Sequence, residues 1–276
     1  MAPDARPPSA LTIAGSDSGG GAGIQADLKT FSAHRVHGLS AVTALTAQNT
    51  GGVFAVHVPP PAFLRAQIDA CFDDFNIAAV KVGMLATAEV IHVVADALDR
   101  HRPPWIVLDP VMIATSGARL LEADAVDALR ARLLPMASVI TPNVPEAEAL
   151  IDATIRTQDE ADAALLRLLH LGCRAVMLKG GHLEEGDKVF DRYVEASSRE
   201  VFAHRRLLLQ AHGTGCSFAA AVAANLCLGH DMAIACRLAS DYVARGLQDG
   251  YRPGSSDVLV LDHAAARRPE NKKAGE

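Results

Sequence analysis

Short apolar runs recur along the chain, and an amphipathic segment follows most of them. The runs are rich in Val, Ile, Leu and Ala and predict buried strands at 11–14, 39–47, 78–84, 105–108, 138–140 and 175–178. The amphipathic segments carry apolar residues three or four positions apart and predict helices at 24–34, 62–75, 87–100, 122–134, 145–150 and 157–171. Weaker patterns predict strands at 53–58, 189–194 and 201–209, and helices at 217–227 and 231–247.

Strands and helices that alternate at this spacing indicate an α/β fold, in which helices cover both faces of a mostly parallel sheet. No internal repeat and no linker interrupts the alternation, so we expect a single domain over residues 11–264. Residues 1–10 are rich in proline, and residues 265–276 are charged and poor in apolar side chains. We expect both of these ends to be disordered tails.

The composition excludes several classes of protein. The chain is 50% hydrophobic and has a net charge of −6, so it lacks the basic excess of a protein whose main partner is nucleic acid. No apolar run reaches the length that spans a membrane. The five cysteines are an odd number without CxxC spacing, which favours reduced thiols in the cytoplasm over disulfides or a zinc site.

The segment 212–217, His-Gly-Thr-Gly-Cys-Ser, has two glycines directly before an Ala-rich helical segment. A glycine turn that opens a helix directs unpaired N–H groups and the positive end of the helix dipole at one point, which suits a phosphate. Cys216 stands at that point, where a helix N-terminus tends to lower a thiol pKa and so favours a base or nucleophile. A helix-ending glycine followed by a small buried cysteine is the structural alternative.

The first predicted strand is followed by a glycine-rich loop at 15–23. Residues 21–26 match G-x-G-x-x-A, but no acidic residue occurs between Asp27 and Asp69 to bind the ribose of a dinucleotide. No Gly-Lys-Ser/Thr follows the glycines, so a P-loop is absent as well. A loop that closes over a small polar substrate fits this segment better.

Polar residues follow the predicted strands at the edge of the sheet where open α/β proteins bind ligands. They are Asp17, Gln48, Asp109, Asn143 with Glu146, and Lys179, together with Met84 and the turn at Gly213. Singly, each has an ordinary structural explanation: Asp109 could form a turn, Glu146 could complement a helix dipole, and Lys179 could be solvated. Together they suggest phosphoryl transfer, which needs a cation for phosphates, acids for Mg²⁺, and a group that positions the hydroxyl.

Several segments then resemble one known family. The loop and helix at 15–31 look like the opening signature of hydroxymethylpyrimidine/phosphomethylpyrimidine kinases, which belong to the ribokinase-like superfamily. The likeness continues, in the family's order, at 43–50, 81–84, 107–112, 140–147, 178–182 and 212–216. The resemblance covers about residues 11–250.

This resemblance implies a ribokinase-like three-layer sandwich and an ATP-dependent kinase of thiamine biosynthesis. The family phosphorylates the hydroxymethyl group of 4-amino-5-hydroxymethyl-2-methylpyrimidine, and then the monophosphate to the diphosphate. The implied ligands are the pyrimidine, ATP and Mg²⁺, and the need for K⁺ is open. Dimers are common in the superfamily, which leaves a homodimer open.

The resemblance also assigns roles around the substrate. Cys216 takes the position of the catalytic base, and the N–H groups of Gly213, Thr214, Gly215 and Cys216 would form an anion hole. Gln48 would bind the pyrimidine, since its amide carries the donor and the acceptor that an aminopyrimidine edge requires. Gly15, Asp27 and Met84 would complete the pocket, although Asp27 could instead complement a helix dipole.

The remaining implied roles concern phosphate and metal. Asn143 and Glu146 match the N-x-x-E element that organises Mg²⁺ and phosphate in the family. Lys179, Asn143 and Asp109 would contact ATP, and Glu146 with Asp109 would hold the metal ion.

Some positions depart from the family pattern. Ala-Thr-Ser-Gly-Ala at 114–118 replaces the more usual Ala-Lys-Ser-Gly-Asp, and so loses a lysine at Thr115 and an acid at Ala118. Gln210-Ala211 stands where Asn-Thr is frequent, and 257–263 lacks the usual glycine-rich ending. These departures bear on rate and nucleotide affinity, and leave the efficiency of the second phosphorylation open.

Two other functions compete with this interpretation. Pyridoxal-phosphorylating relatives carry a second cysteine where this chain has Ala114, and tend to lack a histidine at the position of His212. Both features favour the pyrimidine over pyridoxal. A non-catalytic pyrimidine-binding protein is the alternative from another class, and the presence of Cys216, Asn143, Glu146 and Lys179 argues against it.

Overall fold

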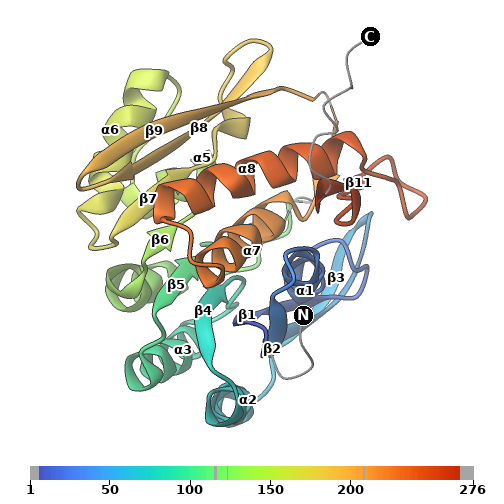
Figure 1. The fold of residues 1–276 in the computed structure, drawn as a ribbon, viewed down its shortest axis with the longest axis vertical. Helices are drawn as coiled ribbons and strands as arrows, with labels where there is room; N and C mark the ends of the chain where they lie inside the picture. The colour runs from blue at the N-terminus through green and yellow to red at the C-terminus, as the bar shows by residue number, and fades with distance from the viewer. Residues whose placement is uncertain (1–5, 115–116, 123, 208, 268–276) are drawn as a thin grey trace.

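The computed structural model describes residues 6–114, 117–122, 124–207 and 209–267. A nine-stranded sheet runs through the molecule (Figure 1). Its strands, in spatial order, are β3 (Gly52–His57), β2 (His37–Asn49), β1 (Ser9–Asp17), β4 (Ile77–Val82), β5 (Trp105–Leu108), β6 (Val139–Ile140), β7 (Ala175–Leu178), β8 (Lys188–Glu195) and β9 (Ser198–Arg205).

In this spatial order, neighbouring strands from β2 through β1 to β7 pair in parallel. Antiparallel strands flank them, β3 on one side and β8 with β9 on the other. The chain goes from β1 to β2 on one side and then crosses to β4 on the other side of β1. The order of the strands therefore reverses beside β1, and a crevice beyond the carboxyl ends at such a point is where open α/β sheets bind ligands.

Helices cover both faces of the sheet, as the sequence predicts (Figure 1). One face is covered by α1 (Gly23–Ala33), α7 (Thr214–Cys227) and α8 (Met232–Gln248), and the other by α2 (Pro61–Asp74), α3 (Ala88–His101), α4 (Ala125–Ala128), α5 (Val144–Ile151) and α6 (Gln158–Leu169). Neighbouring strand residues point to opposite cores: Val107 packs with α7 and α8, whereas Leu108 packs in the cluster with α3 and α6.

The central helix of the first face, α7, is buried almost all round. Its ten residues from Ser217 to Leu226 are all buried, and five of them are alanines. A helix that is apolar on every side belongs in a core. Small alanine side chains let α7 lie close to β4 and β5, and this packing fixes the position of the turn at its N-terminus.

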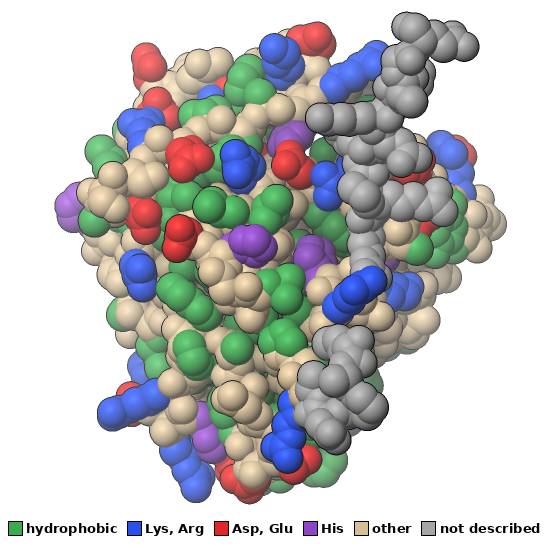
Figure 2. Space-filling model, viewed as in Figure 1, with side chains coloured by type: hydrophobic (Ala, Val, Ile, Leu, Met, Phe, Trp, Pro, Cys, Tyr) green, Lys and Arg blue, Asp and Glu red, His purple; other side chains and the backbone are tan. Residues whose placement is uncertain are grey.

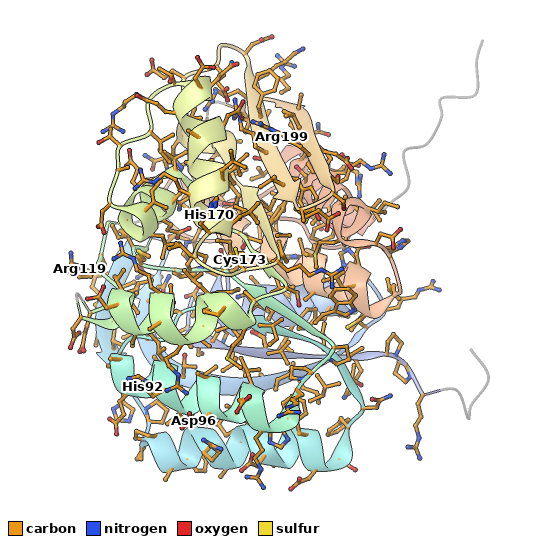
Figure 3. All side chains as sticks on the ribbon, turned by 90° about the vertical axis from the view of Figure 1, so that its left-hand side faces the viewer. His92, Asp96, Arg119, His170, Cys173 and Arg199 are labelled. Atoms are coloured by element: carbon orange, nitrogen blue, oxygen red, sulfur yellow. The ribbon has the colours of Figure 1, made fainter. Side chains whose placement is uncertain are left out.

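Charged side chains of both signs are interspersed over the face that carries α8 (Figure 2). On the other face, α2 and α3 lie side by side, with His92 and Asp96 on α3 (Figure 3). Arg132 binds both of these side chains, at 3.0 Å from His92 Nδ1 and 2.6 Å from Asp96 Oδ1. No helix among the described residues is long and apolar enough to cross a membrane.

The helix predicted at 122–134 is divided into three types of turn. It forms α4, then a π-helix at Leu129–Leu133 and a 3₁₀-helix at Leu134–Met136. Pro135 has no N–H to donate to Ala131, so the regular α-helical ladder cannot continue there. The spacing of apolar residues along the sequence does not predict this change in helix type.

The domain boundaries differ slightly from the predicted ones. β1 begins at Ser9, because Ser9 and Ala10 pair with the start of β2, so residues 9 and 10 are not part of a tail. A 3₁₀-helix at Ala265–Arg267 follows the predicted end, with Ala266 buried against α8. Residues 1–5 and 268–276, on which the rest of the tail prediction falls, lie outside the described residues.

Candidate active site

The strand order brings the sequence-predicted residues to one edge of the sheet. Gln48 lies near the end of β2, Asp109 directly follows β5, and Lys179 directly follows β7. Two further residues, Met84 and Asn143, follow β4 and β6 by two and three positions. The N-terminal turn of α7 reaches the same edge, because a Cβ atom on Gly215 would lie only 3.1 Å from Lys179 Nζ.

The glycine turn at 213–216 opens a helix rather than ending one. Gly213 is the N-cap of α7, with φ at +78°, and it follows the short strand β10 (Ala211–His212). A Cβ atom at Gly213 would lie 1.8 Å from the Gly21 carbonyl oxygen, so only glycine fits where this turn meets the loop at 15–23. No side chain among the described residues caps α7, which leaves its first N–H groups available to an anion.

A small parallel pairing that the sequence does not predict supports this turn. β10 pairs with β11 (Leu259–Val260), and Val260 comes within 2.8 Å of a Cβ position on Gly21. The C-terminal segment thus packs beneath the contact between the glycine loop and the turn. A two-residue strand carries no detectable alternation, so only the tertiary structure reveals it.

Cys216 is half-buried at this turn, and the backbone of Gly23 favours its thiolate form. Burial raises the pKa of the Cys216 thiol to about 11, and the nearby Lys81 cation opposes this only in part. The expectation that the helix N-terminus lowers this pKa is therefore wrong. Loss of water around the thiolate outweighs the favourable field.

A buried ion pair lies close to Cys216. Lys81 Nζ is 2.8 Å from Asp27 Oδ2, and both side chains are completely shielded from solvent. Thr12 Oγ1 donates to the same oxygen at 2.6 Å, while Asp27 Oδ1 has no hydrogen-bond partner among the described residues. Burial lowers the pKa of Lys81, but Asp27, Cys216 and Asp109 together raise it by more, so Lys81 remains a cation.

Asp27 therefore does not act as a helix-dipole complement, since the first turn of α1 holds no acidic residue. Lys81 is the main residue that the sequence prediction of the site missed. The available signal was a lysine within the otherwise apolar strand at 78–84. A charge at a position that the alternation assigns to the core usually has a buried partner.

Lys179 and Asp109 form a second ion pair next to Gly215. Lys179 Nζ is 3.0 Å from Asp109 Oδ1, which also accepts a hydrogen bond from Thr141 Oγ1 at 3.1 Å. Burial lowers the pKa of Lys179, but Asp109 and Glu146 raise it above its ordinary value. A cation thus lies beside the unpaired N–H groups of the α7 turn.

Asn143 and Glu146 form the capping box of α5. Glu146 N donates to Asn143 Oδ1 at 2.9 Å, and Asn143 N donates to Glu146 Oε2 at 2.8 Å. Burial raises the pKa of Glu146 to about 7, although Lys179 opposes this. Within the described part of the chain, no three His, Cys, Asp or Glu side chains gather as a ready metal site.

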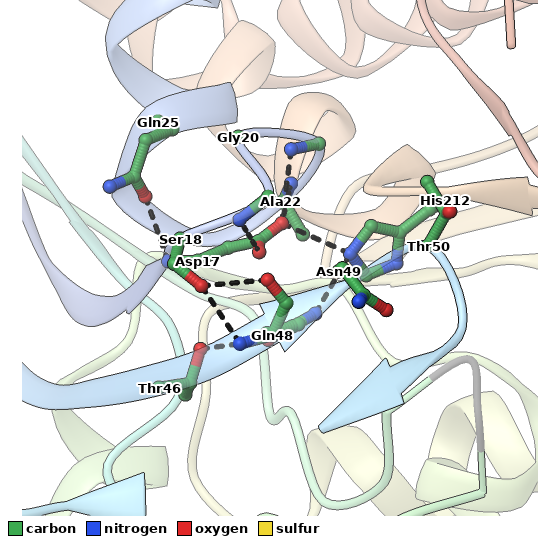
Figure 4. Close-up of polar contacts among 12 residues, drawn as sticks. Asp17, Ser18, Gly20, Ala22, Gln25, Thr46, Gln48, Asn49, Thr50 and His212 are labelled. Atoms are coloured by element: carbon green, nitrogen blue, oxygen red, sulfur yellow. Dashed lines mark hydrogen bonds and ion pairs between the residues drawn. The ribbon is translucent and has the colours of Figure 1, made fainter. Parts of the chain in front are cut away.

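Of the residues predicted to bind the pyrimidine, Gly15 and Gln48 lie near the ends of β1 and β2, Met84 follows β4, and Asp27 lies on α1. A Cβ atom on Gly15 would lie 2.9 Å from Met84 Sδ, so the missing side chain lets Met84 approach β1. Met84 packs with Ala44 and Ala86 in a small buried apolar cluster there. Gln48 contacts Thr46 Oγ1 at 3.0 Å and His212 Nε2 at 2.9 Å (Figure 4).

The positions that depart from the family pattern are only partly described. Thr115 and Ser116 lie outside the described residues. The Ala118 carbonyl accepts a hydrogen bond from Ala114 N at 2.8 Å. The Gln210 carbonyl accepts from Leu259 N at 2.9 Å, so the divergent C-terminal segment pairs with the divergent residues before the glycine turn.

Comparison with known proteins gives one consistent result. The family model described as phosphomethylpyrimidine kinase matches residues 17–260. The chain belongs to the phosphomethylpyrimidine kinase family. The resemblance seen in the sequence is thereby confirmed.

Curated relatives include kinases of the same name and a longer protein of thiamine biosynthesis. The hydroxymethylpyrimidine/phosphomethylpyrimidine kinase of Salmonella typhimurium is 50% identical over 78% of this chain and 81% of its own length. The thiamine biosynthesis bifunctional protein of Geobacter sulfurreducens is 47% identical, and the chain spans about half of that longer protein, 49% of its length.

Solved structures of two kinases share the fold. Phosphomethylpyrimidine kinase from Clostridium difficile matches with a TM-score of 0.78 and 40% identity, covering 87% of this chain and 99% of that one. Pyridoxal kinase from Bacillus subtilis, solved with ADP, matches with a TM-score of 0.87 and 33% identity, covering 95% and 99%. These matches confirm the ribokinase-like α/β fold, and the fold alone does not separate the two substrates.

Proposed function

We propose that this protein transfers a phosphoryl group from ATP to the hydroxymethyl group of 4-amino-5-hydroxymethyl-2-methylpyrimidine, and then to the resulting monophosphate. The observation that carries the proposal is the Lys179–Asp109 pair beside Gly215, at the open N-terminus of α7. A cation, oriented N–H groups and a thiol lie together there. Phosphoryl transfer requires such groups, because they stabilise the charge on the phosphoryl oxygens and position the hydroxyl. The relatives named as phosphomethylpyrimidine kinases support the choice of pyrimidine.

The residues present fit ATP and Mg²⁺. The N–H groups of the α7 turn and Lys179 suit phosphate oxygens, and Asp109 and Glu146 offer carboxylates at the same edge. One or two protein carboxylates are enough for Mg²⁺, because phosphates and water complete its six ligands. Bound Mg·ATP supplies the phosphoryl group and part of the charge that neutralises it.

Cys216 enters the reaction as a protonated thiol, because its pKa is raised to about 11. In a loose phosphoryl-transfer transition state the hydroxyl keeps its proton until late, so an early base is not required. The Cys216 thiol orients the hydroxyl, and the hydroxyl proton passes to an oxygen of the transferring phosphoryl group as the new O–P bond forms and the bond to the ADP leaving group breaks. The Gly213–Cys216 N–H groups stabilise the charge on the transferring oxygens.

The pyrimidine ring lies against Met84 in this proposal, and Gln48 recognises its aminopyrimidine edge. Asp27 Oδ1, which lacks a partner among the described residues, provides an acceptor for an amino group. Burial raises the pKa of Asp27, and the Lys81 ammonium opposes this shift, because it lies 2.8 Å from the other carboxylate oxygen.

Pyridoxal is the second candidate substrate, favoured by the TM-score of 0.87 with pyridoxal kinase. The sequence features at Ala114 and His212 favour the pyrimidine instead. The two are separated by incubating the protein with Mg·ATP and each compound, and identifying the products by mass. We expect the pyrimidine mono- and diphosphate, and Lys179→Met should lower kcat by more than about 100-fold. Wild-type protein that phosphorylates neither compound would refute the proposal.

A further inference from the structure

Three polar side chains from three separate segments meet at the edge of the site (Figure 4). His212 Nε2, from β10, lies 3.1 Å from Asp17 Oδ2 at the end of β1, and 2.9 Å from the Gln48 amide on β2. The side chains of Asp17 and His212 are 3% and 12% exposed. The contacts are therefore shielded from water, and the placement of each hydrogen matters.

Asp17 can only accept hydrogen bonds in this arrangement. Its two carboxylate oxygens take backbone N–H groups from Gly19 at 2.8 Å, Gly21 at 3.0 Å and Ala22 at 2.8 Å. Burial raises the pKa of Asp17, but the hydrogen bonds from His212, Ala22 and Gly19 lower it below its ordinary value. An ionised carboxylate has no hydrogen to offer, so His212 must present Nε2–H to it.

The other end of the Gln48 amide contacts Thr46. Thr46 Oγ1 lies 2.9 Å from the Ser16 carbonyl oxygen and 3.0 Å from the amide. The hydroxyl has one hydrogen, and the Ser16 carbonyl can only accept, so that hydrogen belongs to Ser16. The contact with Gln48 then has a hydrogen only if the amide nitrogen faces Thr46.

Both ends of the amide thus require the same orientation. Figure 4 draws the amide nitrogen toward His212 and the oxygen toward Thr46. With the amide turned over, so that nitrogen faces Thr46 and oxygen faces His212, every contact contains a hydrogen, and His212 Nε2–H lies between Asp17 and the amide oxygen. The opposite orientation sets the amide N–H₂ against Nε2–H, and leaves one of the two Thr46 contacts without a hydrogen. The two orientations have nearly the same shape, so the hydrogen-bond network decides between them.

We propose that Asp17 and His212 are a positioning pair that holds the Gln48 amide oxygen toward His212, and so fixes the direction in which the site reads an aminopyrimidine. This inference rests on the proposed function and adds a specificity determinant to it. The free edge of the amide then accepts from the 4-amino group on the His212 side, and donates to the ring nitrogen N3 on the Thr46 side.

This direction has a consequence for the chemistry. In the substrate ring, the hydroxymethyl carbon follows the amino-bearing carbon on the side away from N3. An amino group on the His212 side therefore places the hydroxymethyl group toward Gly213 and Cys216, which follow His212 in the chain. The reversed amide would direct the same group away from the α7 turn.

The test compares two substrates in two variants. The 4-oxo analogue presents N3–H and a carbonyl, which is the reverse order of donor and acceptor, so wild-type protein should prefer the 4-amino compound. His212→Leu removes the Nε2–H donor and frees the amide to turn, whereas His212→Gln retains an N–H at a similar distance from the backbone. We expect His212→Leu to lower the kcat/KM preference for the amino compound about tenfold or more, the value of one good hydrogen bond.

His212→Gln should retain the preference within about threefold, and KM for Mg·ATP should change less than about twofold in both variants. If circular dichroism shows His212→Leu to be unfolded, Asp17→Asn should give the same loss of preference. A His212→Leu enzyme that loses activity equally on both substrates would overturn the positioning role while leaving the proposed function intact. Wild-type protein that phosphorylates neither pyrimidine would instead overturn the proposed function, and this inference with it.

Discussion

Removal of Lys81 should destabilise the protein strongly, because it strands a carboxylate in the core. Lys81→Met keeps the length and most of the volume of the side chain and removes its charge. Asp27 would then keep the hydrogen bond from Thr12 and lose the ammonium that lies 2.8 Å away. With neither side chain exposed, water cannot replace the lost partner.

The expected magnitude follows from the distance. Two charges 2.8 Å apart attract by about 6 kcal/mol at an effective dielectric constant of about 20. Part of this is recovered, because Asp27 can take up a proton once the cation is gone. Loss of one partner of a buried pair typically costs about 3–5 kcal/mol, and we expect Lys81→Met to fall in that range.

Urea unfolding followed by circular dichroism measures this change, with the surface pair of Arg100 and Asp69 as the control. That pair is 3.4 Å apart and Arg100 is 65% exposed, so Arg100→Met should cost less than about 0.5 kcal/mol. Asp27→Asn with Lys81→Met should recover at least about half of the loss, since no unpaired charge remains. A Lys81→Met protein destabilised by less than about 1 kcal/mol would refute the buried-pair account.

Three further changes test the site. The pKa of Glu146 is near 4.5 in the unfolded chain and about 7 in the folded protein. The folded state therefore binds this proton more tightly, and the free energy of unfolding falls as the pH rises between these two values. Glu146→Gln should therefore gain up to about 3 kcal/mol relative to wild type at pH 8 and little at pH 4, and a gain that does not depend on pH would contradict this. Gly213→Ala should lower the free energy of unfolding by more than about 2 kcal/mol, because its Cβ would overlap the Gly21 carbonyl. Gly181→Ala is the control: no atom lies within 4 Å of its Cβ position, so it should lower that free energy by less than about 0.5 kcal/mol in the same urea titration. Alkylation of Cys216 by iodoacetamide, followed by mass, should accelerate about tenfold per pH unit up to about pH 10, and a plateau below pH 8 would show that the thiol pKa is not raised.

The regular part of the fold was predictable because strand and helix periods are local. The apolar run at 105–108 and the segment at 157–171 indicate β5 and α6 directly, and Thr157 caps α6 as its side chain suggests. The antiparallel edges and the two-residue pairing of β10 with β11 depend on contacts between distant segments. Their local sequence carries too little information to reveal them.

The sequence predicted which residues belong to the candidate site better than it predicted their charges and pKa values. Parallel strands carry their following residues to one edge, so Asp109 and Lys179 could be expected to meet. The thiol pKa of Cys216 could not be predicted, because it depends on how deeply α7 packs and on a lysine more than 130 positions away in the chain. The roles of Asp17 and His212 likewise depend on hydrogen bonds that cross 195 positions.

A competition experiment tests the central claim most directly. Hydroxymethylpyrimidine and pyridoxal, at equal concentration in one tube with Mg·ATP and the purified protein, compete for the same site. The ratio of products, read by mass at early times, equals the ratio of the two kcat/KM values. The site described here predicts pyrimidine phosphate in excess by more than about tenfold, with the diphosphate following the monophosphate. An excess of pyridoxal phosphate would contradict the assignment of Gln48 and its partners to an aminopyrimidine.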